Sequence, residues 1–394
     1  MPRPVITGLG VVSCLGSGTE DFWLGLHRTP PAPRDVADPG AHFDVRHYHL
    51  ADTDTDTRPA ASARPGGGRP GPASRMAVRA AREAVADSGL DAADASRVAV
   101  VFGTAMGDYP LFEQRSEHEP AETGPFTEYL VASTVADAVG FRGPVTTVAN
   151  ACAASGYALA VAADMIRCGE ADAVVVGGAD TYSRVAMANF NRMGAVDPVR
   201  CRPFDRDRRG TVFGEAAAVL VLESAEHAAR RGAGHVYAEV AGTGWSCDAH
   251  HLTAPEPSGT QIVEAMRRSL RDAEIGPESV GCVIPHGTGT RLNDQVESKA
   301  LGEVFGGGEP LALFSLKAVV GHTAGAAGTM AALTAAMMLD RGEVPPNLAP
   351  LTPDPECDVR LGPLASPLGG DHVMANAYAF GGNNVSVLLG RVSS

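Results

Sequence analysis

The sequence predicts an α/β fold with a duplicated core. Short runs of β-branched residues, which are typical of buried strands, alternate with longer Ala-rich segments that are typical of helices. Two distant stretches also share one plan, in which a strand leads to a reactive residue and then to a helix of small residues. Because the identity between these stretches is slight, the internal repeat is a hypothesis.

The composition limits the kind of protein. The 394 residues, 44% of them hydrophobic, suffice for one large or two medium domains. A formal net charge of −14 argues against nucleic acid or an anionic membrane as the main partner. Seven scattered cysteines without a CxxC pair speak against a disulfide framework or a structural zinc site. With no signal-peptide pattern and no run of about 20 apolar residues, we expect a soluble cytoplasmic protein with no membrane partner.

Strands and helices can be placed along the chain from their patterns. Apolar β-branched runs predict buried strands at residues 5–12, 98–103 and 145–148, and further apolar strands at 173–176, 280–284 and 311–316. Helical periodicity or small-residue composition predicts helices over 76–88, after Cys152, and from 324 to 339.

Cys152 lies where the strand at 145–148 gives way to an Ala-rich helix. The free N–H groups and the positive dipole end of that helix favour a thiolate over a thiol, so Cys152 is a candidate nucleophile. The alternative is a small buried cysteine that packs as a hydrophobic residue, which is the more usual fate of cysteine.

Two histidines in the second half stand in similar surroundings. His286 lies in a Gly-rich turn after one strand, and His322 lies between another strand and a helix of small residues. A single histidine is more often structural than catalytic, but two at strand ends, with Cys152 in the same setting, favour a catalytic site. Lys317 adds a cation beside them, for which a surface lysine is the alternative.

Together these motifs resemble the β-ketoacyl-acyl carrier protein synthases of the thiolase superfamily, specifically the type II elongating condensing enzymes of fatty acid and polyketide synthesis. The resemblance covers nearly the whole chain, because the matching stretches occur in the family order. They are residues 150–155, 175–180, 202–215, 286–290, 293–294, 317 with 321–322, and 379–384.

The resemblance implies the thiolase fold, a five-layered αβαβα core made of two duplicated halves. Residues 1–240 are expected to form an N-terminal thiolase-like half that carries the nucleophile and the dimerisation insertions. Residues 241–394 are expected to form a C-terminal thiolase-like half with both catalytic histidines.

The resemblance also implies a decarboxylative Claisen condensation. An acyl group on Cys152 condenses with malonyl-acyl carrier protein and gives a β-ketoacyl-acyl carrier protein. The N–H groups of His286 and His322 bind the malonyl carbonyl oxygen and stabilise the enolate. The backbone N–H groups of Cys152 and Phe380 form the oxyanion hole, and Phe380 also acts as a gate.

Other residues match positions that bind the substrate in this family. Thr288 and Thr290, and more weakly Thr253, match residues that hydrogen-bond the phosphopantetheine arm. Phe190 matches a gate of the acyl pocket, for which ordinary core packing is the alternative. No cofactor is expected, because the phosphopantetheine arm arrives on the carrier protein.

Lys317 is expected to support the histidines electrostatically, and Glu297 matches a family acid that pairs with this lysine. A structural ion pair is the alternative for both. No metal site is expected, because the adjacent His250 and His251 would point apart on a strand and no carboxylate or cysteine spacing completes a site.

Several residues depart from the family pattern. Ala379 stands where the gate usually has glycine, and Ala331 where many members carry a glutamate. Arg291 stands where the fatty acid enzymes usually have proline, and Asn150 and Ala151 differ from the commoner residues before the nucleophile. These departures favour a type II polyketide or specialised fatty acid pathway.

Two alternatives remain open. The first is a housekeeping fatty acid elongation synthase. The second is a non-catalytic, chain-length-controlling subunit of a ketosynthase heterodimer, although such subunits lack the nucleophilic cysteine that is present here.

The expected partners are an acyl carrier protein and a second chain, in a homodimer or in a heterodimer with a ketosynthase-like chain length factor. Because carrier proteins are typically acidic and this chain is acidic too, docking requires a local basic patch. One candidate patch lies in and beside residues 52–74, a Pro/Gly-rich segment that predicts a mobile surface loop. The candidates, which could also be merely solvated arginines, are Arg58, Arg64, Arg69 and Arg75, or Arg192 and Arg200.

Overall fold

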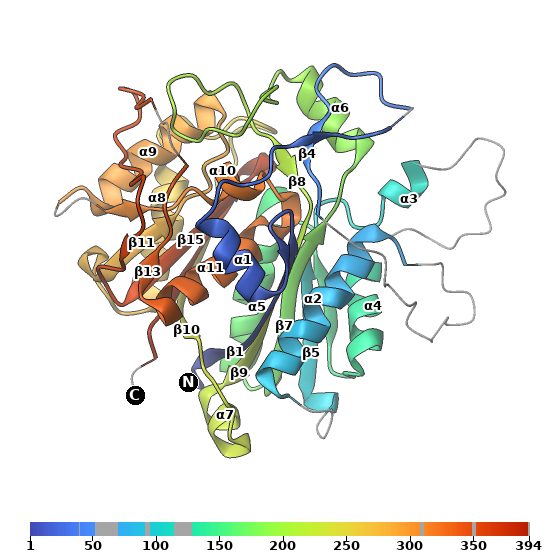
Figure 1. Cartoon of the computed structure of the whole chain (residues 1–394). Helices are drawn as coiled ribbons and strands as arrows, with labels where there is room; N and C mark the ends of the chain where they lie inside the picture. The colour runs from blue at the N-terminus through green and yellow to red at the C-terminus, as the bar shows by residue number, and fades with distance from the viewer. Residues whose placement is uncertain are drawn as a thin grey trace.

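The chain is built around one mixed β-sheet that is flanked by helices (Figure 1). The structure, a computed structural model, describes residues 1–38, 40–51, 70–90, 95–113, 128–307, 311–348 and 352–392. Within those residues the sheet has eleven strands. Ten of them divide into two groups of five, and the short β2 (Gly16–Ser17) pairs with β1 (Pro4–Ser13) at one side.

The first group of strands comes from the N-terminal half of the chain. It contains β1, β5 (Val98–Gly103), β6 (Val145–Val148), β7 (Ala173–Asp180) and β9 (Ala216–Ser224). β5 is parallel to β6 and β7, whereas β9 is antiparallel to β7 and β1. β1, β5, β7 and β9 are apolar along nearly their whole length because helices cover both of their faces.

The second group repeats this scheme. It contains β10 (Ala238–Cys247), β11 (Val280–Ile284), β12 (Ala312–Leu313), β15 (His372–Ala379) and β16 (Asn383–Gly390). β11 is parallel to β12 and β15, whereas β16 is antiparallel to β15 and β10. A short antiparallel pairing of β1 with β10 joins the two groups. The identical topology confirms the predicted α/β core of two duplicated halves.

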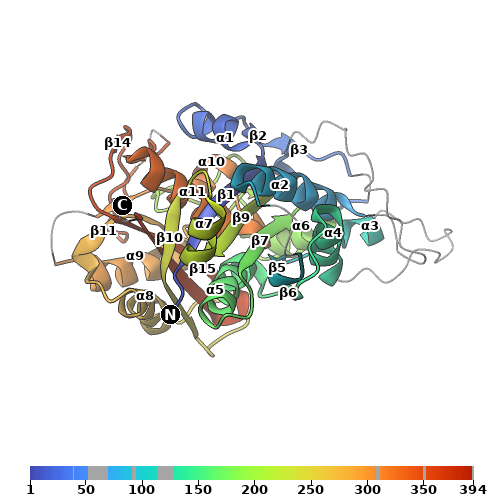
Figure 2. The same ribbon diagram turned by 90° about the horizontal axis from the view of Figure 1, so that it is seen from below.

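Five layers result from the way the helices cover these strands (Figure 2). α5 (Ala154–Arg167) and α11 (Ala327–Arg341) pack against each other in the central layer, between the two groups of strands. A Cβ atom at Gly328 would lie 2.3 Å from the backbone nitrogen of Gly156, so the small residues of both helices permit this close crossing.

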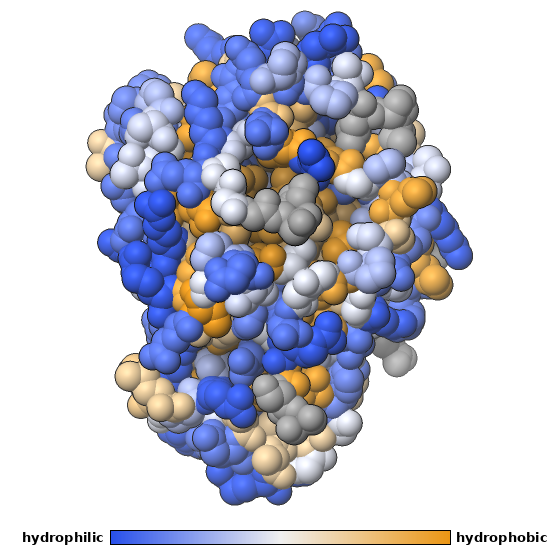
Figure 3. All heavy atoms as spheres, turned by 90° about the vertical axis from the view of Figure 1, so that its left-hand side faces the viewer, coloured by the Kyte–Doolittle hydropathy of each residue, from blue (hydrophilic) through white to orange (hydrophobic). Residues whose placement is uncertain are grey.

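The outer layers are pairs of amphipathic helices. α2 (Pro72–Ser88) and α4 (Tyr129–Val139) cover the first group, and α8 (Thr260–Asp272) and α9 (Arg291–Phe305) cover the second. Seen from the side of α8 and α9, the surface is largely hydrophilic, with hydrophobic residues in small groups between polar ones (Figure 3). These helices therefore turn their apolar faces to the sheet.

Shorter elements connect the layers. The helices among them are α1 (Thr19–Leu26), α3 (Pro110–Glu113), α6 (Arg184–Arg192), α7 (Ala225–Arg231) and α10 (Leu316–Val320). The strands are β3 (Arg34–Asp35), β4 (His47–His49), β8 (Phe213–Gly214), β13 (Glu343–Val344) and β14 (Ser366–Pro367). Short 3-10 turns span Ala95–Arg97, Ala151–Ala153, Pro277–Ser279, Ala324–Ala326 and Phe380–Gly382.

Most of the predicted elements are confirmed. The strands at 98–103, 145–148 and 280–284 have the expected bounds, and those at 5–12 and 173–176 are somewhat longer than expected. The helix predicted over 76–88 begins earlier, at Pro72. Of the segment predicted to be a mobile loop, residues 52–69 lie outside the described part of the chain.

Two predictions about strands are wrong. The strand expected at 311–316 has two residues, Ala312–Leu313. The side-chain amide of Asn347 bonds the backbone of Leu313 and Ser315, and a helix begins at Leu316. β6 is not buried: among the described residues it pairs with β5 alone, and Val145 is 44% exposed.

In the part of the chain that the structure describes, no helix has the length and apolar character needed to cross a membrane.

Candidate active site

Cys152 lies in the 3-10 turn Ala151–Ala153, between β6 and α5. The preceding Ala151 has a left-handed backbone, with φ = 47°. Such a conformation is costly for a residue with a Cβ atom and is typical of functional turns. The second half repeats the turn, because Ala324, with φ = 47°, opens the 3-10 turn before α11.

The thiol of Cys152 differs from the prediction in its protonation. Burial raises its pKa to about 11, although the charge of Lys317 lowers it. Loss of hydration thus opposes the thiolate that the helix N-terminus is expected to favour. Cys152 carries its proton at neutral pH.

His286 lies just beyond the end of β11, as predicted. The carboxylate of Glu297 on α9 accepts the backbone N–H groups of both His286 and Gly287, each at 2.7 Å. Glu297 therefore fixes the turn that carries the histidine. Burial and the nearby charge of Lys317 lower the pKa of His286 well below its ordinary value, so the ring is neutral.

Lys317 lies in the short helix α10 rather than directly after a strand. Its ammonium nitrogen donates to the carbonyl oxygen of His286 and lies 3.3 Å from the Nδ1 atom of that ring. A lysine nitrogen can only donate here, so Nδ1 of His286 accepts and Nε2 carries the proton.

Lys317 and Glu297 interact through their charges. Burial lowers the pKa of Lys317 and raises that of Glu297, while the charge of each partner opposes the shift of the other. Among the described residues, no ion pair within 4 Å joins them; the Glu297 carboxylate is hydrogen-bonded to the His286 turn, and Lys317 to His286 itself. Both side chains thus converge on one histidine.

His322 follows α10 and is 1% exposed. Its ring lies edge-to-face against that of His286, with the centroids 5.5 Å apart. Burial and the charge of Lys317 lower the pKa of His322 well below its ordinary value. The site therefore offers two neutral imidazoles side by side.

A cavity of about 540 Å³ joins most of the predicted site residues. Lys317 and Glu297 do not line it and lie buried behind His286. The predicted residues that do line it are Cys152, Phe190, Thr253, His286, Thr288, Thr290, His322 and Phe380.

Phe380 and Phe190 form one wall of this cavity. Phe380 opens a 3-10 turn in which Gly381 has φ = 82°, a conformation that favours glycine. Its ring stacks on Phe190 of α6 with centroids 5.2 Å apart and planes 9° apart. Ala379, which departs from the family pattern, also lines the cavity.

Hydroxyl groups line another part of the cavity. The Oγ1 atoms of Thr288 and Thr290 lie 2.9 Å apart, and buried Asp294 accepts the backbone N–H of Thr288 at 3.1 Å. Thr253 is held by His251, whose Nδ1 accepts the Thr253 backbone N–H at 3.1 Å.

Asp180, at the end of β7, belongs to the site but was not predicted from the sequence. Its carboxylate accepts the N–H groups of Ala105, Met106 and Gly325 and the hydroxyl of Thr104, all within 2.9 Å. It thus ties the turn of the second half to the first half. A buried acid that ends an apolar strand was the available signal.

An arginine-rich hollow of about 360 Å³ adjoins the mouth of the cavity. It shares three of its lining residues, Arg208, Arg209 and Arg291, with the cavity. Its complete lining is Arg202, Arg206, Asp207, Arg208, Arg209 and Arg291.

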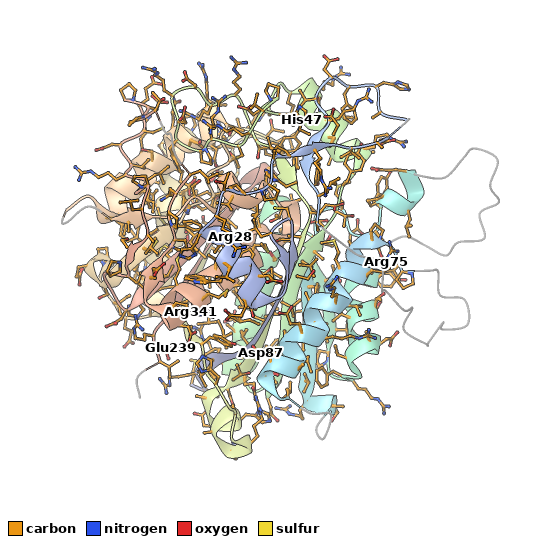
Figure 4. All side chains as sticks on the ribbon, in the orientation of Figure 1. Arg28, His47, Arg75, Asp87, Glu239 and Arg341 are labelled. Atoms are coloured by element: carbon orange, nitrogen blue, oxygen red, sulfur yellow. The ribbon has the colours of Figure 1, made fainter. Side chains whose placement is uncertain are left out.

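The arginines that the structure describes among those predicted for docking, Arg75, Arg192 and Arg200, do not line this hollow. Arg58, Arg64 and Arg69 lie outside the described residues. Arg75 lies on α2, on the side of the molecule away from α9 (Figure 4). Arg192 is exposed at the end of α6, and Arg200 is half-buried.

Sequence families match both halves of the chain. The N-terminal domain of β-ketoacyl synthases matches residues 2–228, and the C-terminal domain matches residues 237–350. The chain belongs to the β-ketoacyl synthase family. A 3-oxoacyl-[acyl-carrier-protein] synthase 2 of Staphylococcus aureus is 33% identical over 98% of both chains.

Solved structures of ketosynthases share the fold. A structure described as the ishigamide ketosynthase/chain length factor matches with a TM-score of 0.91 and 35% identity over 100% of both chains. AntDE:AntF, described as a type II polyketide synthase acyl-carrier protein in complex with its ketosynthase bound to the hexaketide, matches with a TM-score of 0.87 and 26% identity over 100% of both chains. This ketosynthase therefore has the thiolase fold.

Proposed function

We propose that the chain is a β-ketoacyl-acyl carrier protein synthase that condenses an acyl group on Cys152 with malonyl-acyl carrier protein. One observation carries this proposal: a thiol at a helix start and two neutral imidazoles line the same cavity. A thiol alone would suit many transfers, but paired neutral histidines suit the stabilisation of an enolate.

Acyl transfer comes first. The sulfur of Cys152 attacks the thioester carbonyl of the acyl carrier, and the backbone N–H groups of Cys152 and Phe380 stabilise the resulting oxyanion. The carbon–sulfur bond to the carrier breaks, and its phosphopantetheine thiol leaves with the proton that Cys152 gives up. Because the Cys152 thiol is protonated in the free enzyme, this proton moves during the transfer.

Condensation follows when malonyl-acyl carrier protein enters. Carbon dioxide leaves as the carbon–carbon bond to the carboxylate breaks, and the electrons remain as an enolate. The N–H groups of His286 and His322 bind the enolate oxygen. The enolate carbon attacks the acyl-Cys152 thioester, which releases the Cys152 thiolate and a β-ketoacyl carrier. The positive charge of Lys317, which lowers the pKa of Cys152, favours this leaving group.

The enzyme needs no cofactor of its own in this scheme, because the phosphopantetheine arm enters with the carrier protein. The hydroxyl groups of Thr288 and Thr290, and that of Thr253, line the cavity where they can hydrogen-bond the amides of this arm. The stacked pair Phe190 and Phe380 is suited to open and close the acyl side of the cavity.

The acyl carrier protein is proposed to dock at the arginine-rich hollow. Arg209 and Arg291 are exposed there, next to the cavity mouth. Their charges complement an acidic carrier and its phosphate, which resolves the difficulty of an acidic enzyme with an acidic partner. The names of the Staphylococcus aureus relative and of AntDE:AntF both refer to an acyl-carrier protein.

A second chain is proposed to cover β6. This strand ends the sheet with one edge unpaired by any described residue, and an open edge invites another strand. The partner is a second copy or a chain length factor, a class of subunit that the ishigamide ketosynthase structure names. Seven free cysteines accord with our proposal of a cytoplasmic location.

A type II polyketide or specialised fatty acid pathway is the pathway that we propose. The departures at Ala379, Ala331 and Arg291 and the likeness to the polyketide ketosynthase of AntDE:AntF support it. Cys152, His286 and His322 all line one cavity, which argues against a non-catalytic subunit. A housekeeping fatty acid synthase remains the second candidate, supported by the Staphylococcus aureus relative.

Mass spectrometry of the intact enzyme tests the proposal. Incubation with an acyl carrier protein that bears a short acyl chain should add one acyl group at Cys152, and the C152A variant should remain unmodified. Subsequent malonyl-acyl carrier protein should discharge the adduct and yield a β-ketoacyl carrier. Absence of any adduct on the native enzyme, alone or with its partner chain, would contradict the proposed function.

A further inference from the structure

Three aromatic rings form a ladder behind the active site. Tyr48 on β4 is the register partner of Phe213 on β8, and Phe213 is in turn the bridge partner of His322. The rings of Tyr48 and Phe213 have centroids 6.0 Å apart and planes 16° apart. Those of Phe213 and His322 are 5.4 Å apart and 9° apart in plane. The imidazole of His322 is therefore the last member of a nearly parallel stack.

The backbone of His322 is fixed as an extra strand beside β8. Its N–H donates to the carbonyl of Val212 at 2.7 Å, and its carbonyl accepts the N–H of Gly214 at 3.1 Å. Gly321 allows this approach, since a Cβ atom there would lie 2.9 Å from the backbone of Phe213. Register partners place their side chains on the same face of a ladder, so the backbone brings the two rings together.

No hydrogen bond within the described residues orients the His322 ring. Its Nδ1 atom is buried without a partner. A histidine that works through one nitrogen is ordinarily aligned by a hydrogen bond at the other, as Lys317 does for His286. The plane of the His322 ring is therefore set by packing. The ring packs against the parallel face of Phe213, which is itself buried, at 3% exposure.

We infer that Phe213 is a positioning residue that fixes the plane of the His322 imidazole for decarboxylation and condensation. The inference rests on the proposed function of His322. Hydrogen bonds to a developing enolate depend on angle as well as distance, so a ring free to rotate stabilises the enolate less often. Acyl transfer to Cys152 does not use the N–H group of His322 and should therefore depend little on Phe213.

Phe213 also touches the gate. It lies edge-on to Phe190, with centroids 4.7 Å apart and planes 89° apart, and Phe190 stacks on Phe380. A substitution of Phe213 could therefore act through the gate as well as through His322. A gate defect would slow acyl transfer, whereas a histidine defect would slow decarboxylation alone, so the two effects can be separated.

The test compares Phe213→Leu, which removes the flat face, with Phe213→Tyr, which keeps it. Phe22→Leu is the matched control, because Phe22 is equally buried but lies on α1. For each variant of the purified enzyme with its partner chain, the acylation rate of Cys152 is measured. The kcat and KM for decarboxylation of malonyl-acyl carrier protein are measured in parallel.

For Phe213→Leu we expect decarboxylation kcat to fall about ten-fold or more, with KM and the acylation rate changed less than about three-fold. Phe213→Tyr should restore most of the kcat, and Phe22→Leu should leave it near the wild-type value. Unchanged decarboxylation in Phe213→Leu would overturn the inference. So would an equal loss in Phe213→Tyr, or a parallel loss of acylation and decarboxylation.

A second variant guards against misfolding. If Phe213→Leu does not fold, Tyr48→Leu loosens the same stack from its outer end and should lower decarboxylation kcat about three-fold without slowing acylation. An unaltered kcat would then overturn the inference. If the wild-type enzyme and both variants acylate and condense normally, only this inference is contradicted. If the wild-type enzyme takes up no acyl group, the proposed function itself is contradicted.

Discussion

The thiol of Cys152 shows how burial decides the state of a reactive side chain. A pKa of about 11 corresponds to about 3 kcal/mol against the thiolate, compared with about 1 kcal/mol that a helix N-terminus contributes in its favour. Burial therefore has the larger effect on the pKa of Cys152, and the charge of Lys317 reduces the rise only in part. The free enzyme thus holds a protonated thiol, which gives up its proton to the departing carrier thiol as its sulfur attacks the thioester.

The first prediction concerns alkylation of Cys152. Its rate with iodoacetamide should rise about ten-fold for each pH unit until the pH approaches about 11, because only the thiolate reacts. Lys317→Met should raise the pKa further and slow the reaction at any pH below it. Peptide mass spectrometry must follow Cys152 alone, since Cys168 and Cys247 are exposed. A plateau below pH 8 would contradict the prediction.

The second prediction concerns His49, a buried residue on β4. Burial lowers its pKa to about 4, from an ordinary value near 6.5. The unfolded chain therefore takes up a proton before the folded one as the pH falls, so stability is complete above about pH 6.5 and declines toward pH 4. This single group accounts for about 3 kcal/mol of that decline.

Chemical denaturation of wild type and His49→Gln at pH 7 and pH 4 measures the effect. The free energy of unfolding should fall less in the variant than in the wild type between the two pH values. Equal falls would show that His49 is not held neutral in the folded protein.

At the scale of elements, the sequence predicted long buried strands well and short or exposed ones badly. β5 and β11 are apolar and almost completely buried, so their composition alone identifies them as buried strands. β6 has the same β-branched composition, but composition does not say that its strand ends the sheet. At the end of β12 the backbone bonds Asn347, more than thirty residues along the chain, a partner that no local pattern reveals.

The third prediction concerns the open edge at β6. Val145→Lys should keep the fold, because the side chain is already 44% exposed, but should disfavour pairing with a second chain. Analytical ultracentrifugation should show a shift from dimer to monomer. Leu364→Lys, at a residue that is 78% exposed in the other half, is the control and should leave the dimer intact. A Val145→Lys variant that remains fully dimeric would show that the partner binds elsewhere.

At the scale of the whole molecule, an acidic chain carries a strongly basic site. The chain carries a net charge of −14, yet five arginines gather in one hollow at the mouth of the cavity. Asp354 and Asp294 partly neutralise Arg208, and Asp197 partly neutralises Arg202. The net charge of the chain repels an acidic partner, whereas the arginines of this hollow attract it, which favours docking with the partner facing the hollow.

The fourth prediction follows from this arrangement. Arg209→Glu combined with Arg291→Glu should weaken acyl carrier protein binding at least about ten-fold and reduce its dependence on salt. Acylation from a small thioester that lacks the carrier should change little. Arg28→Glu, at an exposed residue after α1, is the control. Normal carrier binding by the double variant would show that the carrier docks at another surface. Weaker carrier binding by Arg75→Glu would indicate a docking surface on α2.

The active site was predictable where chemistry-bearing residues stand next to strand ends. Cys152, His286 and His322 could be named because each follows an apolar run and precedes glycine or small residues. The arginine-rich hollow could not, because residues 202–209 and Arg291 meet only through the packing of distant segments. Asp180 was missed for a similar reason, since most of its partners belong to other turns.

The two matching turns have a consequence for how many acyl groups one chain can hold. Gly325 occupies the place in the second half that Cys152 occupies in the first, after an alanine of the same φ. A side chain there would lie 2.4 Å from the backbone nitrogen of Ala105 and 2.6 Å from the carboxylate of Asp180. Grafting a second nucleophile onto this scaffold would thus require Asp180 to be rebuilt first. In the second half, the turn instead donates the backbone N–H of Gly325 to Asp180 and so holds the two halves together.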